Sequence, residues 1–293
     1  MWVYMNDTFV PAAEARVSVL DRGFLYGDGL FETLAAYDGR LFRLEAHLER
    51  LYTAAAALGF VVPVDQATLG QCLYACLAKN AMQDAILRVS VSRGQSQRGL
   101  STLACSAPTL LILCFPPRFY PPTMLQHGVH VIVSSVPRAL QWTARPQPKT
   151  TNFLNNILAL REAEAAGAVE ALMLNAAGHL TEGAVSNVFL VRDGALWTPA
   201  LACGVLPGIT RAAVLEVAAE QHLTVHETCL EAEALWSAQE AFYTNTTALI
   251  MPITQINAHR LGAPGPITQR LRQGLVALIE REAGRLWSAP GPQ

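Results

Sequence analysis

The chain has 293 residues, of which 52% are hydrophobic and 15% are charged, and this length suffices for one large domain or two ordinary domains with separate cores. Its formal net charge of -2, with no run of lysines and arginines, excludes the basic footprint of a nucleic-acid-binding protein or of a segment for anionic membrane surfaces. We therefore expect small molecules, or a second copy of the chain, as its partners.

The cysteines are scattered without the spacing of metal ligands, so we expect no metal site. Cys72 and Cys76, four residues apart on an expected helix, suit one buried helix face better than a bridge. Residues 1–6 lack the basic start and long apolar region of a signal peptide, and no later apolar run reaches membrane-spanning length. We therefore expect a cytoplasmic protein with reduced thiols. The six cysteines are Cys72, Cys76, Cys105, Cys114, Cys203 and Cys229.

The first 115 residues predict a mixture of strands and helices. Apolar residues with helical spacing predict a helix over 44–58, and a second helix is expected over 66–79. Three glycines in the seven residues 23–29 indicate tight backbone geometry or close approach to another group just before a strand. Strands are expected at 2–5, 8–10, 16–20, 34–36, 41–42, 86–92 and 109–114.

Four prolines occur in the seven residues 116–122, and such a segment continues neither a helix nor a central strand. We therefore place an interdomain linker at 116–125, between a small N-terminal domain over 1–115 and a larger C-terminal domain over 126–293. Both domains mix helices and strands, which predicts the α+β or mixed α/β class. In the second domain, helices are expected at 151–166, 209–221 and 267–285, and strands at 129–135, 171–175, 187–197 and 241–244.

Lys149 is one of only two lysines in the chain, the other being Lys79. Arginine cannot replace lysine where a neutral amine must attack a carbonyl, because the guanidinium does not deprotonate in proteins. A Schiff-base role would explain why a chain so poor in lysine keeps one between a proline and a helix start. The alternative is a solvated loop lysine.

An amine-based mechanism with a phosphorylated aldehyde cofactor also needs a phosphate site and an acid for the ring nitrogen. The segment 207–211 begins an apolar helix with Pro-Gly, so that backbone amides and the Thr210 hydroxyl face an anion at the positive helix end. Glu182, between two expected strands, could hold a protonated ring nitrogen. The alternatives are an ordinary helix start and an exposed turn glutamate.

Two further groups suit a phosphate or carboxylate. Residues 244–247, Thr-Asn-Thr-Thr, offer hydroxyls and amides at a strand end, although such clusters are also common in plain turns. Arg50 could bind a phosphate bidentately. Its alternative is an ion pair on the helix surface, which the absence of an acid three or four residues away disfavours.

Five motifs in order resemble the class IV aminotransferases of pyridoxal-phosphate fold type IV. The resemblance extends from about Asp21 to Thr247, and the whole set is far more specific than any one motif. It implies a small α+β domain and a larger domain, with the cofactor between them and the site completed by a second subunit of a homodimer. The motifs are Asp21-Arg22-Gly23 with 26–29, 47–51, Lys149 with Asn152, Thr181-Glu182-Gly183 with Ser186-Asn187, and 206–211.

The resemblance implies a role for each matching residue in a pyridoxal 5'-phosphate enzyme. Lys149 would form the Schiff base with the cofactor and move the proton at the substrate Cα, and Glu182 would pair with the pyridine nitrogen. Leu206 would pack under the ring, and amides near Thr246 and Thr247 would meet a substrate carboxylate. The implied phosphate ligands are Arg50, Ile209, Thr210 and Thr246.

Departures from the family patterns bear on the substrate. The branched-chain enzymes carry a Tyr-x-Arg strand, whereas this chain has Ile86-Leu87-Arg88 and lacks the tyrosine. D-amino acid enzymes carry an Arg-x-His pair and a tyrosine before the glutamate that matches Glu32. This chain keeps Arg98 but has Leu100 and Phe31 in place of the histidine and the tyrosine.

We therefore predict a transaminase that moves an amino group from a D-amino acid, and also from (R)-primary amines, to a 2-keto acid in two half-reactions. The substrate-binding residues would be Phe31, Arg88, Arg98 and Thr247, with either arginine binding the carboxylate. Aminodeoxychorismate lyase and branched-chain L-amino acid aminotransferase are the alternative activities. A catalytically idle scaffold is the alternative from another class, but structural packing does not require this set of lysine, glutamate and phosphate ligands.

Overall fold

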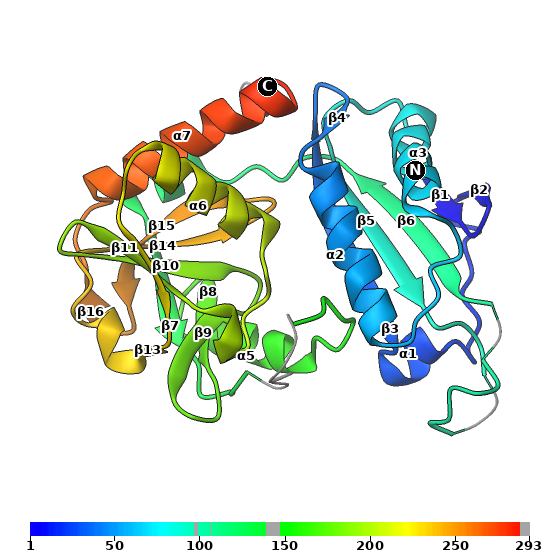
Figure 1. The fold of residues 1–293 in the computed structure, drawn as a ribbon, viewed down its shortest axis with the longest axis horizontal. Helices are drawn as coiled ribbons and strands as arrows, with labels where there is room; N and C mark the ends of the chain where they lie inside the picture. Colours follow the sequence, from blue (N-terminus) through cyan, green and yellow to red (C-terminus); the bar gives the residue numbers. More distant parts are fainter. Residues whose placement is uncertain (97–98, 106, 139–146, 288–293) are drawn as a thin grey trace. The chain divides into compact units, whose positions relative to one another are not determined.

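The computed structural model describes residues 1–96, 99–105, 107–138 and 147–287, and it divides into two compact units (Figure 1). Unit 1 comprises Met1–Arg118, Pro148–Asn152 and the residues from Ile279 on, and unit 2 comprises Phe119–Gln147 and Phe153–Leu278. Our expected domain limits place residues 148–152 and 279–287 in the second domain, whereas the structure groups them with unit 1. The linker at 116–125 stays a prediction. No helix in the described ranges is long and apolar enough to cross a membrane.

Unit 1 is built on an antiparallel sheet, which has six strands within the described residues in the order β2-β1-β6-β5-β3-β4. The long central strands β3 and β5 pair without a break from Gly29 to Ala36. Apolar side chains dominate both strands, and this composition suits the middle of a sheet. The strands are β1 (Trp2–Met5), β2 (Thr8–Pro11), β3 (Gly29–Tyr37), β4 (Arg40–Leu41), β5 (Ala85–Ser92) and β6 (Thr109–Phe115).

Helices α2 (Leu44–Ala57) and α3 (Gln66–Lys79) pack on this sheet (Figure 1). Leu48 and Leu51 of α2 and Leu73 of α3 join Leu87 and other strand residues in one buried cluster. Their spacing is the helical period from which both helices are predicted. A third, short helix, α1 (Arg22–Tyr26), precedes β3.

Unit 2 contains a larger mixed sheet. Within the described residues it has ten strands, nine of them in the order β12-β11-β10-β14-β15-β7-β8-β9-β13, with β16 paired to β15. The strands are β7 (Val129–Val133), β8 (Glu170–Leu174), β9 (His179–Gly183), β10 (Asn187–Arg192), β11 (Ala195–Pro199), β12 (Val225–Thr228), β13 (Leu230–Glu231), β14 (Glu240–Asn245), β15 (Leu249–Ile256) and β16 (His259–Arg260).

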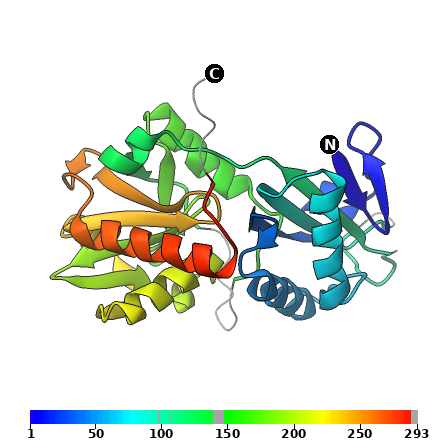
Figure 2. The same ribbon diagram turned by 90° about the horizontal axis from the view of Figure 1, so that it is seen from above.

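The longer helices of this region are α5 (Leu154–Ala165), α6 (Ile209–Glu220) and α7 (Pro266–Glu282), and the short ones are α4 (Pro122–His127), η1 (Leu201–Cys203) and η2 (Ala232–Leu235). Helices α6 and α7 lie side by side (Figure 1 and Figure 2). Gly274 of α7 lies against Val217 of α6, where a Cβ would clash. The glycine therefore permits the close packing of these two helices.

Three elements differ from the sequence prediction. The strand expected at 16–20 is absent, because these residues form a loop between β2 and α1. Helix α4 begins inside the proline-rich segment because Pro122 is at the first helical turn, where the missing N–H of proline costs no hydrogen bond. Helix α5 begins at Leu154 instead of residue 151, because the backbone around Thr150 pairs with Leu30 at the beginning of β3 as an extended segment. Periodicity alone does not reveal that competing partner.

The expectation of reduced thiols is wrong for one pair, because Cys203 and Cys229 form a disulfide with a Cα–Cα distance of 6.1 Å. The parallel pairing of β11 with β12 sets Pro199 opposite Thr228, which brings the segments that follow the two strands together. This pairing is non-local, so spacing along the chain does not predict it. A cytoplasmic location stays a prediction.

Candidate active site

Lys149 lies in unit 1, where its segment pairs with the beginning of β3. The amide of Phe31 donates to the carbonyl of Lys149 at 2.9 Å, and the amide of Thr151 donates to the carbonyl of Gly29 at 2.9 Å. The backbone from Lys149 to Thr151 is thus held against a central strand of the sheet. Because main-chain hydrogen bonds fix this backbone, they also fix the position of the Lys149 Cα, from which the side chain extends.

Glycines before β3 allow this close approach. The Asn152 side-chain amide donates to the carbonyl of Gly27 at 3.0 Å, and the Thr151 hydroxyl donates to the same carbonyl at 2.7 Å. Gly27 has a φ of 65°, and a Cβ there would lie 2.8 Å from the Asn152 Oδ1. The sequence predicts tight geometry or a close approach at these glycines, and the structure confirms the close approach, to the segment that carries Lys149.

Two cationic side chains contact the buried ring of Phe31. The Arg88 guanidinium carbon lies 3.8 Å from the ring centroid, and the Lys149 Nζ lies 4.6 Å from it. Such cation–π contacts are favourable, and more so away from water. Burial lowers the pKa of the Arg88 guanidinium. Unit 1 therefore brings together three of the predicted site residues, and their combined positive charge suits a carboxylate.

Arg50 of α2 pairs with Glu32 of β3. The Arg50 Nε donates to Glu32 Oε1 at 2.7 Å and its Nη2 donates to Oε2 at 2.6 Å. The sequence correctly disfavours an ion pair along the helix surface, but it misses this partner because Glu32 is eighteen residues away on a strand. A bidentate pair fixes the orientation of the guanidinium.

His47 completes this buried group, with its Nδ1 2.8 Å from Glu32 Oε2. Burial lowers the pKa of His47 more strongly than the hydrogen bond to Glu32 raises it. For Glu32, burial alone would raise the pKa, but the charge of Arg50 and the hydrogen bonds from both partners lower it to about 2. The carboxylate is therefore ionised at neutral pH and the imidazole is neutral.

Glu182 lies near the end of β9 in unit 2 and is also held from several sides. Arg138 Nη2 lies 2.7 Å from Glu182 Oε1. The Leu206 amide donates to Oε2 at 2.9 Å, and the Asn187 Nδ2 lies 3.2 Å from the same oxygen. Glu182 is 5% exposed, so the alternative of an exposed turn glutamate is wrong. Sequence reasoning assigned no role to Arg138, because no spacing signal links residue 138 to residue 182.

The turn after Glu182 wraps around a second buried carboxylate, that of Glu170. Glu170 Oε1 accepts the Ala184 amide at 3.0 Å, and its Oε2 accepts the Val185 amide at 3.3 Å and the Ser186 hydroxyl at 2.8 Å. Burial raises the pKa of Glu170, and the hydrogen bonds from the turn oppose this effect. Glu170 therefore holds the turn that connects Glu182 to β10.

The beginning of α6 is open toward an anion. Gly208 is the N-cap and offers no side chain to the first amides of the helix, which carry the positive end of the helix dipole. A Cβ on Gly208 would clash with Asn187 Oδ1. Arg211 points elsewhere, because its Nη2 donates to the carbonyl of Pro199 and to Glu227. The amides at Ile209 and Thr210 are therefore the groups suited to a phosphate.

The predicted cluster at the end of β14 is a hydrogen-bonded turn. Asn245 Oδ1 accepts the amide of Thr247 at 3.0 Å and that of Ala248 at 2.8 Å, so the Thr247 amide already has a partner. The Thr247 hydroxyl lies 3.0 Å from the Tyr120 hydroxyl. Within the part of the chain that the structure describes, the buried Thr244 hydroxyl has no hydrogen-bond partner.

Comparison with known proteins identifies the family. Residues 29–256 match the model of the amino-transferase class IV family. The chain belongs to the class IV aminotransferases. A putative branched-chain-amino-acid aminotransferase of Methanocaldococcus jannaschii is 36% identical, over 93% of this chain and 94% of that protein. A D-alanine aminotransferase of Bacillus licheniformis is 32% identical, over 97% of this chain and 99% of that protein.

Solved structures agree with this family assignment. The branched-chain aminotransferase of Thermoproteus uzoniensis with norvaline superposes with a TM-score of 0.89, at 33% identity, over 96% of this chain and 95% of that chain. Another solved branched-chain amino acid aminotransferase carries pyridoxamine 5'-phosphate. Class IV aminotransferases use pyridoxal phosphate, so this chain is a pyridoxal-phosphate-dependent transaminase of the predicted mixed α+β fold.

The residues of this class IV aminotransferase fit that cofactor. Unit 1 supplies an anchored lysine, and unit 2 supplies an ionisable carboxylate and an uncapped helix N-terminus with a glycine at the N-cap. An amine, a ring-nitrogen acceptor and an anion site are the groups that a phosphorylated pyridine aldehyde requires. The fit to the cofactor therefore rests on the chemistry of Lys149 and Glu182 and on the N-terminus of α6, which has no side-chain cap.

The predicted site residues of this aminotransferase are distributed over both units. Phe31, Arg50, Arg88 and Lys149 lie in unit 1, and Glu182, Leu206, Ile209, Thr210, Thr246 and Thr247 lie in unit 2. Arg98 lies outside the described residues. In unit 2, the hydrogen bond from the Leu206 amide to Glu182 joins two predicted positions directly. Asn187 was predicted only as part of a motif. Its side-chain amide donates both to Glu182 and to the carbonyl of Leu206, and thus connects these two residues a second time.

Proposed function

We propose that this class IV aminotransferase moves an amino group from a D-amino acid, and also from (R)-primary amines, to a 2-keto acid. The observation that carries the proposal is the contact of both Arg88 and Lys149 with the ring of Phe31. A donor carboxylate beside this ring would offset the charge of Arg88, which stays protonated while the Lys149 amine takes part in the reaction. The apolar ring itself would tolerate a donor without a carboxylate. The D-alanine aminotransferase among the relatives supports the choice of chirality.

Bound pyridoxal phosphate supplies an electron sink that stabilises negative charge at the α-carbon of the donor. We assign the removal and return of the proton at this carbon to the Lys149 Nζ, because an amine can act as a general base only when neutral. Glu182 would accept a hydrogen bond from the protonated ring nitrogen of the cofactor. The Arg138 charge and the Leu206 amide hold Glu182 in place for this task.

The remaining residues bind and orient. We assign the phosphate to Arg50, Ile209, Thr210 and Thr246, the underside of the ring to Leu206, and the substrate to Phe31, Arg88, Arg98 and Thr247. The pair with Glu32 occupies the Nε and Nη2 of the Arg50 guanidinium, and it would fix the orientation in which Arg50 meets a phosphate. The Thr247 amide and hydroxyl both donate to Asn245 Oδ1, so the turn would hold Thr247 in a fixed position beside the substrate.

We also propose that the enzyme is a homodimer. Apolar side chains are exposed around α1, where Val19 is 73% and Phe24 is 76% exposed. A second copy of the chain would remove this surface from water. The proposal predicts a dimer mass by analytical ultracentrifugation, and a shift toward monomer in the variant Phe24→Asp.

The test of the activity follows the visible absorbance band of the purified holoenzyme while donors are added separately. D-alanine should bleach the band faster than L-leucine, and (R)-1-phenylethylamine faster than its (S) enantiomer. D-alanine with 2-oxoglutarate should yield pyruvate. Fast turnover of L-leucine without pyruvate from D-alanine would instead establish the branched-chain activity that the relative from Methanocaldococcus jannaschii suggests. Pyruvate from aminodeoxychorismate without any keto acid would establish the lyase.

The two lysines provide a matched control for the role of Lys149. Borohydride reduction of the holoenzyme should attach a phosphopyridoxyl group to Lys149 and not to Lys79, which lies 4.4 Å from the Trp2 ring centroid. Lys149→Ala should lose the visible band and the activity, whereas Lys79→Ala should keep both. A label on Lys79, or on no residue, would contradict the proposed mechanism.

A further inference from the structure

The disulfide between Cys203 and Cys229 is buried at one end and exposed at the other. Cys203 ends helix η1 and is 2% exposed, whereas Cys229 is the exposed residue between β12 and β13. Both cysteines belong to unit 2. A thiol in solution can therefore approach the bond from the Cys229 side while the protein stays folded. Exposed disulfides are the ones that thiols reduce most readily.

The buried end of the disulfide is three residues from a group that holds Glu182. The Leu206 amide donates to Glu182 Oε2 at 2.9 Å, and the Leu206 carbonyl accepts the Asn187 side-chain amide at 3.0 Å. Val205, between Cys203 and Leu206, is 1% exposed. Because this short stretch is packed inside the protein, a shift at its beginning is transmitted to its end. The position of Cys203 therefore bears directly on the position of the Glu182 carboxylate.

The segment 203–208 belongs to no strand of the sheet, so a ladder of main-chain bonds does not fix it. The Cys203 carbonyl accepts the Asn175 side-chain amide at 3.2 Å, and the disulfide adds a covalent link to the end of β12. A cross-link of this kind removes conformations that the segment would otherwise explore. Gly208, at the end of the segment, is the N-cap of α6. The disulfide is therefore placed to steady both the contact to Glu182 and the beginning of α6.

We propose that the Cys203–Cys229 disulfide is a redox-sensitive cross-link that controls how firmly the enzyme holds pyridoxal phosphate. In the oxidised protein it keeps the Leu206 amide on Glu182 and the first amides of α6 in place. In the reduced protein the segment 203–208 is loosened and the cofactor binds more weakly. This inference rests on the proposed function, in which Glu182 and the beginning of α6 bind the cofactor.

The chemistry requires a dithiol reductant. One thiolate of the dithiol attacks the exposed Cys229 sulfur, and the S–S bond breaks as Cys203 leaves as a thiolate. The second thiol of the reductant then attacks the mixed disulfide, which releases Cys229 and closes the reductant into its own disulfide. Two electrons and two protons pass from the dithiol to the protein, so both cysteines become thiols. A small-molecule disulfide reverses these steps.

The test compares oxidised wild-type protein with wild-type protein reduced by dithiothreitol, both freed of cofactor and of reductant under nitrogen. Titration with pyridoxal phosphate, followed by the visible band, should give a Kd about tenfold higher for the reduced protein, the effect of losing one hydrogen bond to a charged group. Amide hydrogen exchange over 203–208 should also be faster in the reduced protein before any cofactor is added.

Two serine variants separate this disulfide from the other cysteines. Cys229→Ser should show the higher Kd of the reduced protein and should not respond to dithiothreitol. Cys72→Ser, at a free thiol, should keep the wild-type Kd and the full response to reduction. Reoxidation of the reduced wild-type protein should restore the lower Kd.

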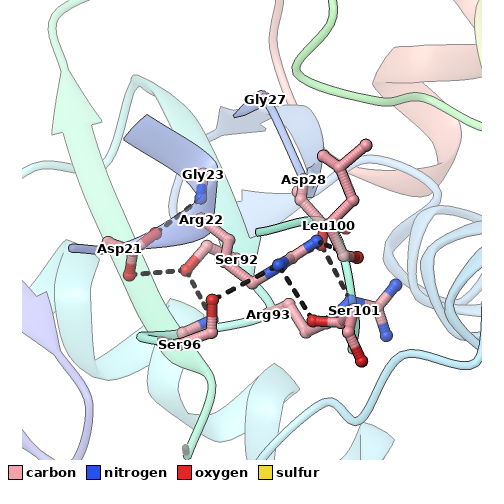
Figure 3. Close-up of polar contacts among 12 residues, drawn as sticks. Asp21, Arg22, Gly23, Gly27, Asp28, Ser92, Arg93, Ser96, Leu100 and Ser101 are labelled. Carbon is pink, nitrogen blue, oxygen red and sulfur yellow. Dashed lines mark hydrogen bonds and ion pairs between the residues drawn. The ribbon is translucent and has the colours of Figure 1, made fainter. Parts of the chain in front are cut away.

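A general loss of stability would also weaken cofactor binding, so a variant far from the disulfide in the chain serves as the control. Arg93 in unit 1 lies beside Asp28 (Figure 3), and its Nε donates to that carboxylate at 2.9 Å. Its other nitrogens donate to the carbonyls of Gly59 and Leu58 at 2.6 and 3.1 Å. Arg93→Gln should lower the free energy of unfolding but leave the Kd of the oxidised protein and the exchange over 203–208 unchanged.

The inference is overturned by equal Kd values in the oxidised and reduced protein, by unchanged exchange over 203–208, or by the same loss of affinity in Arg93→Gln. If Cys229→Ser does not fold, the reduced wild-type protein gives the same comparison. A wild-type protein that binds pyridoxal phosphate without a visible band or any transaminase turnover would refute the proposed function instead. Hydrogen exchange of the cofactor-free protein does not depend on activity, so the two failures are distinguishable.

Discussion

Both oxygens of the Glu32 carboxylate accept hydrogen bonds from Arg50, at 2.7 and 2.6 Å. The pair links β3, a central strand of the sheet, to helix α2. Glu32 thereby orients Arg50, the candidate phosphate ligand, without contacting the phosphate itself. Because Glu32 is 1% exposed, its negative charge depends on Arg50 and His47 for compensation. The pair therefore contributes to stability as well as to the site.

Glu32→Gln should change the acid stability of the protein. The pKa of Glu32 is lowered from 4.5 to about 2 in the folded state, so its contribution to stability is complete above pH 4.5 and is lost as the pH falls toward 2. We expect the substitution to lower the free energy of unfolding by about 2–4 kcal/mol at pH 7. It should also flatten the pH dependence within this window. Urea unfolding between pH 2 and pH 7 measures both effects.

A control is available in the same unit. Arg43 and Glu282 form a partly exposed ion pair at 2.8 Å, and such pairs contribute about 0–1 kcal/mol. Glu282→Gln should therefore leave the unfolding curves nearly unchanged. Equal effects of the two substitutions would show that the buried pair has no special role.

Gly183→Ala should weaken both the fold and the hold on the cofactor. A Cβ at Gly183 would clash with the Ser186 hydroxyl and lie 3.0 Å from the Glu170 carboxylate. Overpacking of this kind costs about 1–3 kcal/mol. Because the turn follows Glu182 directly, we also expect weaker binding of pyridoxal phosphate, measured by titration of the apoenzyme with the visible band as the signal.

Gly70→Ala is the matched glycine substitution. A Cβ at Gly70 would lie 3.6 Å from the Leu44 side chain, an ordinary contact, and alanine is favoured over glycine inside a helix by about 0.5–1 kcal/mol. This variant should be slightly stabilised and should bind the cofactor normally. A destabilised Gly70→Ala would mean that space in this core is tighter than the structure indicates.

Local signals in the sequence predict much of this fold, and the gaps have a common cause. The period of Leu44, Leu48 and Leu51 predicts α2, and the glycines before β3 predict the close approach that Asn152 makes. The partners of Arg50 and Glu182, namely Glu32 and Arg138, were not predicted as such because each pair joins distant segments. Position in the folded chain, and not spacing, brings these charges together.

The same limit explains the disulfide, which was not predicted. Cys229→Ser should lower the free energy of unfolding of the oxidised protein by about 3.5 kcal/mol, the chain-entropy value for a sequence separation of 26 residues. Denaturant unfolding with and without a reductant measures this difference. Cys72→Ser, at a partly buried free thiol, should leave the effect of the reductant intact. A wild-type protein that is insensitive to reductant would contradict the prediction.

Phe31→Tyr should increase the preference for donors that carry a carboxylate. A hydroxyl at this ring, close to the Arg88 guanidinium and the Lys149 amine, would add a hydrogen bond for a carboxylate and a desolvation cost for an apolar group. We expect the ratio of kcat/KM for D-alanine to that for (R)-1-phenylethylamine to rise about tenfold. Phe9→Tyr adds a hydroxyl beside Tyr4 in the same unit and should leave the ratio unchanged. An unchanged ratio in Phe31→Tyr would remove the Phe31 ring from the substrate site.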